Sequence, residues 1–220
     1  MVHFQRARSV EQREIRRQAI LDTAANMLTE MPVVDLGLNE LARRVCLAKS
    51  NVLRYFESRE AVLLELLDLR YREWITTVTP LLADTGGDLR ARRDRLVGAL
   101  VSTLADEPVL CDLFNAQAAI LERNISAEVA ARYKQKMLAA TADLVTPVER
   151  LVPEFGADGA MKFCAAALLS AGALWSHSHP APAMLAAYEL HPELAAARLE
   201  FVPVLTELLE VLARGLLTRD

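Results

Sequence analysis

GLNELARRVCLAKSNVLRYF, the stretch from Gly37 to Phe56, decides the fold, because two short helical patterns meet in it across a tight corner. Apolar residues before the corner fall at i, i+3, i+4 and i+7, the spacing of one helix face: Leu38, Leu41, Ala42 and Val45. The periodicity resumes after the corner at Val52, Leu53 and Phe56, with Leu47 available to plug the corner itself. Because the second helix is too short to be stable alone, the pattern predicts two helices that support each other.

The second helix of this pair carries hydrogen-bond donors and cations on its outward positions. These residues are Lys49, Ser50, Asn51, Arg54 and Tyr55. A short helix held at a sharp angle by a partner is how a helix-turn-helix presents side chains to the major groove of DNA. Such corners also occur in all-helical proteins that do not bind DNA, so the pair alone leaves both interpretations open.

The segments that flank the corner resemble one protein family. An amphipathic first helix ends with the segment from Ile20 to Leu28, and a fourth helix opens with the segment from Glu57 to Leu63. The order Ile20-Leu21, Ala24-Ala25, Leu41-Ala42 and then YFESREAVL, residues 55–63, resembles the N-terminal domain of TetR-type transcriptional regulators. The resemblance covers about residues 12–70, and it is the combined spacing that makes it specific.

From this resemblance and the helical patterns we expect an all-α protein with two domains. Residues 1–60 are the expected helix-turn-helix DNA-binding domain, and residues 61–220 are the expected helical ligand-binding and dimerisation bundle. We expect a cytoplasmic bacterial regulator that binds a pseudo-palindromic double-stranded operator as a homodimer, and that a small apolar or amphipathic effector releases. A repressor is the first expectation, and the sequence does not separate it from an activator.

Roles at the DNA follow from side-chain chemistry. The guanidinium of Arg54 can address a guanine with two hydrogen bonds, so Arg54 is the expected base contact. Lys49 and Arg59 begin two helices and are expected to hold phosphates. Arg16, Arg17 and Arg44 are weaker candidates for phosphate contact.

Three positions depart from the family pattern. Cys46 replaces the turn glycine, so a left-handed backbone there would have to accommodate a Cβ atom at some cost. Ala48 precedes the recognition helix and cannot accept hydrogen bonds from its first N–H groups, as a small polar residue would. Leu53 stands where an aromatic residue often touches phosphate. These departures keep open a helical interaction scaffold that has lost DNA binding.

Charge is distributed as DNA binding requires. Residues 1–60 hold ten Lys and Arg against eight Asp and Glu, whereas the whole chain has a net charge of −4. Relative basicity in an otherwise acidic protein therefore lies in the segment that contains the corner. It is densest in an N-terminal arm, expected to contact the DNA backbone or a minor groove unless it is merely a solvated terminus: Arg6, Arg8, Arg13, Arg16 and Arg17.

Beyond residue 70 the sequence predicts a series of helices. Ser58, Asp88 and Ser126 are expected caps, and Pro147 is expected to bend or stop the helix that follows Ser126. We expect a loop over residues 177–192 and a last helix opening at Glu193, with one wide apolar stripe: Leu194, Phe201, Leu205, Leu208, Leu209, Leu212 and Leu216. This helix and the alanine-rich one before it are the expected dimer interface, the alternative being an intramolecular core.

Residues that could line an effector pocket lie on the bundle helices: Phe114, Gln117, Tyr133, Met137, Met161, Phe163, Cys164 and Trp175. Each could equally be ordinary core. His177 and His179 suggest a metal site, but HxH on a helix puts the rings on different faces, and further ligands are not evident. No cofactor is therefore expected. Without a phosphate loop, GxSxG or HExxH motif, an all-α enzyme is the weaker alternative.

Cysteine usage and hydropathy place limits on the class of protein. Cys46, Cys111 and Cys164 are far apart and odd in number, which suits reduced thiols. The arginine-rich N-terminus has no apolar signal core, so we expect no export. Residues 163–188 lack Asp, Glu, Lys and Arg, but histidines, prolines and serines interrupt them. We expect an apolar helix too short to span a membrane.

Overall fold

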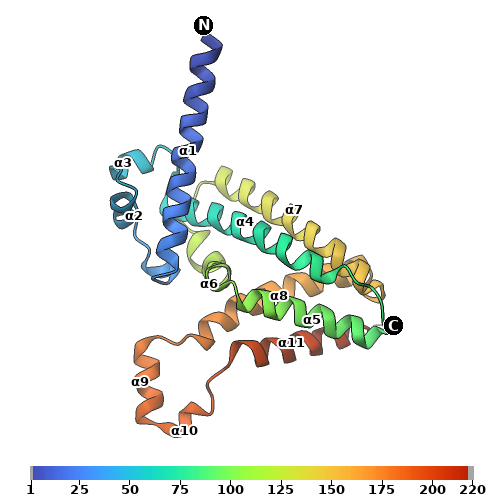
Figure 1. Cartoon of the computed structure of the whole chain (residues 1–220). Helices are drawn as coiled ribbons and strands as arrows, with labels where there is room; N and C mark the ends of the chain where they lie inside the picture. The colour runs from blue at the N-terminus through green and yellow to red at the C-terminus, as the bar shows by residue number, and fades with distance from the viewer. Residues whose placement is uncertain (1, 218–220) are drawn as a thin grey trace. The chain divides into compact units, whose positions relative to one another are not determined.

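The computed structural model describes the backbone of residues 2–217 and the side chains of residues 11–217, and every regular element in that range is helical (Figure 1). The predicted all-α class is therefore confirmed. The main helices are α1 Val2–Leu28, α2 Leu38–Arg44, α3 Lys49–Val52, α4 Arg59–Val78, α5 Leu89–Ala105, α6 Pro108–Ala116, α7 Ala127–Leu151, α8 Gly156–Ser178, α9 Pro182–Leu190, α10 Pro192–Ala195 and α11 Phe201–Leu217. The expected contacts of Arg6 and Arg8 lie outside the described side chains.

Short tight turns complete the path of the chain. They are the 3₁₀ segments η1 Val33–Asp35, η2 Thr79–Leu82 and η4 Pro153–Phe155, and the π-helical turn η3 Gln117–Leu121 that continues α6.

The chain forms two compact units. The first runs through Leu67 and includes Ala116–Tyr133, and the second comprises Asp68–Asn115 and the chain from Lys134 onward. In the first unit, the apolar faces of α1 to α4 share a core: Ile20, Leu21, Ala24, Met27, Leu41, Ala42, Val52, Phe56, Val62 and Leu63. In the second unit, α11 packs against α8 and α5.

Three predicted helix caps are confirmed. The Oγ atom of Ser58 accepts from the N–H of Ala61 at 3.1 Å. A carboxylate oxygen of Asp88 accepts from the N–H of Ala91 at 2.8 Å, and the Oγ of Ser126 accepts from the N–H of Val129 at 3.3 Å. Each cap satisfies an N–H group that the first turn of its helix leaves without a partner.

The apolar stretch that includes α8, a helix of the second unit, is longer than the sequence suggested. Pro153–Ser178 is 26 residues long and apolar enough, by length and composition alone, to cross a membrane, which corrects the expected shortness. Half of its most apolar window is buried within the protein, as in the core helix of a bundle. Gly172 permits close approach of α6, because a Cβ there would lie 2.9 Å from the backbone nitrogen of Asn115.

The expected loop over residues 177–192 is wrong. α8 continues to Ser178, and residues 182–190 form helix α9, while Pro192–Ala195 form α10. Two of the prolines that suggested a loop, Pro182 and Pro192, stand in the first turns of these helices, where a missing N–H costs nothing. The last long helix begins at Phe201 rather than at Glu193, and α7 runs through Pro147 to Leu151.

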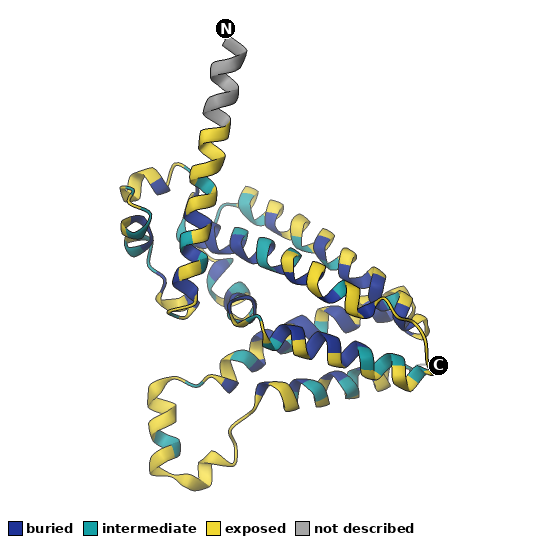
Figure 2. Cartoon of the chain, in the orientation of Figure 1, coloured by how far each residue is buried: buried dark blue, intermediate teal, exposed yellow. Residues whose placement is uncertain are grey.

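The predicted apolar stripe of the last helix separates into two faces. Phe201, Leu205 and Leu209 are buried, but Leu208 is exposed, and Leu194 lies outside α11 altogether. Figure 2 shows buried and exposed stretches alternating along the last part of the chain. The helix is therefore apolar on the side that packs within the chain and on a second side that does not.

Candidate nucleic-acid interface

The corner between α2 and α3 is a Schellman motif with cysteine at its left-handed position. Cys46 has φ 57°, and it is the only non-glycine residue with positive φ among the described residues. Its N–H donates to the carbonyl of Arg43 at 3.1 Å, and the N–H of Leu47 donates to that of Ala42 at 2.9 Å, the two bonds that define the motif. The left-handed backbone that the sequence analysis considered for Cys46 is present, so its Cβ atom is accommodated there.

Helix α3 presents its polar residues to solvent. Val52 is its one buried residue, and Ala48, at the N-cap, makes no side-chain capping bond, as the sequence indicated. Lys49, Ser50, Asn51 and Arg54 are exposed and Tyr55 is half-buried. Within residues 11–217, the side chains of Lys49, Asn51 and Arg54 have no ion pair or hydrogen bond, so their donors are available to a ligand.

Arg17 joins three elements of the first unit. Its guanidinium pairs with both carboxylate oxygens of Glu65 on α4 and donates to the carbonyl of Tyr55 at 3.0 Å. It also lies over the ring of Phe56, 4.3 Å from the centroid. Arg17 is therefore engaged within the first unit, and the phosphate contact that the sequence suggested stays a prediction.

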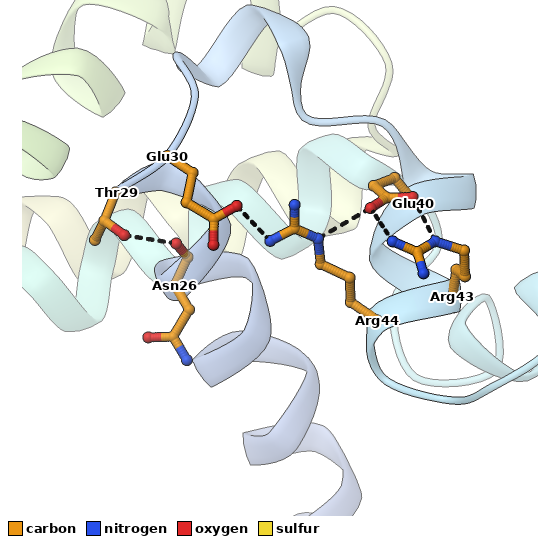
Figure 3. Close-up of polar contacts among 6 residues, drawn as sticks. All are labelled: Asn26, Thr29, Glu30, Glu40, Arg43 and Arg44. Atoms are coloured by element: carbon orange, nitrogen blue, oxygen red, sulfur yellow. Dashed lines mark hydrogen bonds and ion pairs between the residues drawn. The ribbon is translucent and has the colours of Figure 1, made fainter.

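Arg44 is likewise held by carboxylates, as Figure 3 shows. It donates to Glu30, just beyond α1, at 2.7 Å and to Glu40 on α2 at 3.0 Å, and its side chain is 28% exposed. Arg43, which is far more exposed, binds Glu40 through two nitrogens. Hydrogen bonds from Arg43 and then Arg44 lower the pKa of Glu40 from 4.5 to about 2. This carboxylate therefore stays charged at acidic pH values at which an ordinary glutamate takes up a proton.

Arg59 also turns inward. Its guanidinium donates to the carbonyls of Val34 and Leu36 at 3.3 and 3.1 Å, and it pairs with Glu60 at 3.3 Å. These bonds connect the start of α4 to η1, the segment that leads into α2. Arg59 has fewer donors left for phosphate than its position at a helix start suggested.

A basic hollow lies beside α3 in the first unit. Its volume is about 290 Å³, and its lining is Gln12, Arg13, Arg16, Arg54 and Tyr55. Among residues 11–217, no carboxylate lines the hollow and the three arginines have no anionic partner. Three guanidinium groups around one opening favour an anion such as a phosphate.

The sequence predicts that Arg13 belongs to the N-terminal arm but does not assign it to a site. The signal was present in the spacing of Arg13 and Arg16, which lie three residues apart and thus on one helix face. The pattern could not reveal that Arg17, the residue after Arg16, lies on the side of α1 that faces the core of the unit and pairs there with Glu65. Arg13 and Arg16 therefore separate from Arg17, on the surface and engaged within the unit respectively, only in the folded unit.

The predicted effector residues fall in both compact units, and their common pocket stays a prediction. Gln117 and Tyr133 belong to the first unit, whereas the other candidates belong to the second. Within the second unit, Phe114 packs on Tyr71, Phe163 packs on Phe155, and Trp175 packs on Phe201. Met137 is half-buried and Cys164 is buried, where desolvation raises the pKa of its thiol to about 12. Met161 is 39% exposed on α8, and its place in a pocket wall stays a prediction.

The two histidines of the WSHSH segment are placed differently. His177 is exposed, whereas the ring of His179 stacks on Trp175 with centroids 3.8 Å apart. The Nδ1 atom of His179 lies 3.0 Å from the carbonyl oxygen of Trp175. In the part of the chain that the structure describes, no three His, Cys, Asp or Glu side chains gather in a metal-binding group.

Sequence comparison relates the chain to known regulators. Residues 68–220 match a family described as "Tetracyclin repressor-like, C-terminal domain". Over 53 residues the chain is 43% identical to the HTH-type transcriptional regulator EthR of Mycobacterium tuberculosis and of Mycobacterium bovis. That match spans 24% of this chain and 24% of EthR, about a quarter of each.

Solved structures share the fold. A protein assigned to the TetR family of transcription regulators, from Shewanella sp. PV-4, superimposes with a TM-score of 0.52 at 16% identity, over 91% of this chain and 96% of that one. The fatty acid degradation regulator FadR from Bacillus halodurans also gives 0.52, at 14% identity, over 92% and 98%. At these identities the likeness shows the architecture alone.

Proposed function

This chain belongs to the TetR family of transcriptional regulators, and we propose that it is a cytoplasmic repressor that binds a pseudo-palindromic double-stranded DNA operator as a homodimer. In this proposal residues 1–60 bind DNA, and residues 61–220 bind an effector and dimerise. The observation that carries DNA binding is the set of unpaired cations beside α3, namely Lys49 and the three arginines of the basic hollow.

Each exposed side chain takes a role that its surroundings favour. Arg54 is the proposed base contact, since its guanidinium is exposed and unpaired and can bind guanine with two bonds. Lys49, Ser50, Asn51 and Tyr55 complete the recognition surface. Arg13 and Arg16 hold phosphates on the α1 side of the hollow. Arg17, Arg44 and Arg59 hold the elements together instead of contacting DNA.

The test of DNA binding begins with selection of a tight-binding sequence from a randomised double-stranded library. Arg54→Ala should cost about 1–3 kcal/mol on that sequence and relax specificity at one base pair. If Arg54→Ala lowers the affinity for all DNA sequences equally, Arg54 contacts a phosphate rather than a base. Failure to enrich any sequence, with the protein folded, would favour the interaction scaffold.

Helices α8 and α11 pack against each other within the chain. Their outward faces, which this contact leaves uncovered, support a homodimer. Exposed apolar residues follow one stripe on α8 and another on α11: Met161, Leu169, Leu208 and Val211. A two-fold interface brings the same patch of each copy together. Leu208→Asp would bury a charge there, so the variant should sediment as a monomer and lose operator affinity.

Release by an effector requires that the ligand bind the DNA-incompetent state more tightly than the DNA-bound state. Such coupling amounts to about 1–3 kcal/mol, and DNA must weaken ligand binding by the same factor. We place the pocket among the helices of residues 88–178, with Phe114, Met137 and Trp175 as candidate wall residues. Screening apolar and amphipathic small molecules with and without operator DNA tests it: a ligand bound equally in both cases is not an effector.

A further inference from the structure

The hairpin of α9 and α10 has no buried residue, although it is apolar. We call residues 180–200 the arm. Its large apolar side chains are exposed: Met184, Leu185, Leu190, Leu194 and Leu199. In the described part of the chain α9 and α10 pack on each other and have no extensive contact with another helix, and Figure 1 shows them as a hairpin extending from the ends of α8 and α11.

Such an arm is not stable by itself. Helix α9 has nine residues and α10 has four, both below the length at which a helix persists in water without tertiary packing. Contiguous exposed apolar surface in a folded protein marks an interaction site. The arm therefore needs a partner surface that its own chain does not supply.

The surroundings of the arm identify that partner as a second copy of this chain. The arm leaves α8 at its C-terminus and enters α11 at its N-terminus, and these two helices carry the exposed stripes proposed for dimerisation. Val202, 47% exposed at the start of α11, places a further apolar side chain between Leu199 of the arm and Leu208 of the proposed dimer face. Between His179 and Leu190 the arm contains one charged residue, Glu189, so covering this first half of the arm removes almost no charge from water, whereas the second half holds Glu193, Arg198 and Glu200.

The same chain also offers a receiving surface. A hollow of about 540 Å³ opens at the base of the arm, and its lining combines apolar and polar side chains: Ser178, His179, Ala195, Arg198, Leu199, Glu200, Phe201, Val202 and Pro203. A projecting apolar hairpin and a hollow on one chain are self-complementary under two-fold symmetry. We infer that each arm lies across the second copy, along its α8–α11 face and over the hollow at its arm base. The inference rests on the proposed homodimer.

The experiment compares dimer dissociation constants by analytical ultracentrifugation. Leu190 is 77% exposed on the arm, and Leu138, 67% exposed on α7, is a matched control at the surface of the same unit. Leu190→Asp should raise the dissociation constant at least tenfold, and Leu138→Asp should leave it unchanged. Because Leu190 contributes to no core within its own chain, loss of folding is not the expected cause, and circular dichroism checks this.

Hydrogen exchange of the wild-type protein supplies a second measurement. Amides of residues 183–190 should be protected above the dissociation constant and exchange rapidly below it. Equal dissociation constants for the two variants, or protection that does not depend on concentration, would overturn the arm contact. If Leu208→Asp dissociates the dimer and Leu190→Asp does not, the proposed homodimer stands and the arm inference fails. A wild-type protein that never dimerises overturns both.

Discussion

Two pairs of short helices in this molecule meet at corners, α2 with α3 and α9 with α10, and they are stabilised in opposite ways. In the first pair Leu41, Ala42 and Val52 are buried, and an ion pair between Arg44 and Glu30 connects α2 to the residues just after α1. In the second pair no residue is buried. A helix of four residues persists in either case only through what packs on it, so the comparison separates support from within the chain from support by a partner.

The difference also explains which helices the sequence could reveal. At α2 the apolar residues recur at helical spacing because one face meets the core of the same unit, and the periodicity identified that face. On the arm the apolar residues have no face toward their own chain, and proline stands at the start of each helix. Helical periodicity is found by assuming that one face of a helix packs on the core of its own chain. This assumption fails for α9 and α10, so the sequence did not predict them.

The largest expected effect tests whether the two corners differ in intramolecular support. Leu41 is fully buried, and Leu41→Ala should destabilise the protein by about 2–5 kcal/mol through lost contacts and a cavity. Leu190→Ala should change stability by less than about 0.5 kcal/mol when no partner is bound. Urea unfolding of both in the Leu208→Asp background measures this without the dimer. Equal destabilisation would mean that the arm is supported by its own chain.

The next effect separates positioning arginines from phosphate contacts. Arg17→Leu should weaken operator binding by about 1–3 kcal/mol, because Glu65 and the carbonyl of Tyr55 lose a charged hydrogen-bond partner. The slope of log affinity against log salt should stay unchanged, since no phosphate contact is lost. Arg16→Ala is the matched control, and it should make that slope shallower by about 0.9. A shallower slope for Arg17→Leu would mean that Arg17 contacts a DNA phosphate.

Sequence predicted the corner, the helix class and the caps at Ser58, Asp88 and Ser126, because these depend on residues close together in the chain. It could not divide the arginines by role. Arg16 and Arg17 are adjacent in sequence, yet only Arg17 meets a carboxylate from a helix 48 residues away. Nor could it separate effector contacts from core, since an aromatic residue on a bundle helix reads the same in the sequence whether it lines a cavity or packs on Tyr71 or Phe155.

A smaller effect concerns the backbone of the first corner. A residue with a Cβ costs about 1–2 kcal/mol in the left-handed region, and part of this is offset because glycine has more freedom in the unfolded chain. Cys46→Gly should therefore stabilise the protein by about 1 kcal/mol, seen as a rise of about 2–4 °C in Tm. Cys46→Ala keeps the Cβ and should give no such rise. If both variants gain equally, the thiol rather than the backbone is the source of strain.

The smallest effect concerns the missing cap of α3. Ala48 already has the extended backbone of an N-cap, with φ −67° and ψ 146°, and its carbonyl accepts from the N–H of Asn51 at 2.8 Å. A hydroxyl on this residue could accept from the N–H of Ser50 or Asn51 without moving the chain. Thr and Val have the same shape and differ by that hydroxyl, so Ala48→Thr should be more stable than Ala48→Val by about 0.5–1 kcal/mol. Hydrogen exchange of α3 amides should slow in the Thr variant alone. Equal exchange in the two would show that the rest of the corner, rather than the cap, determines how often this helix opens.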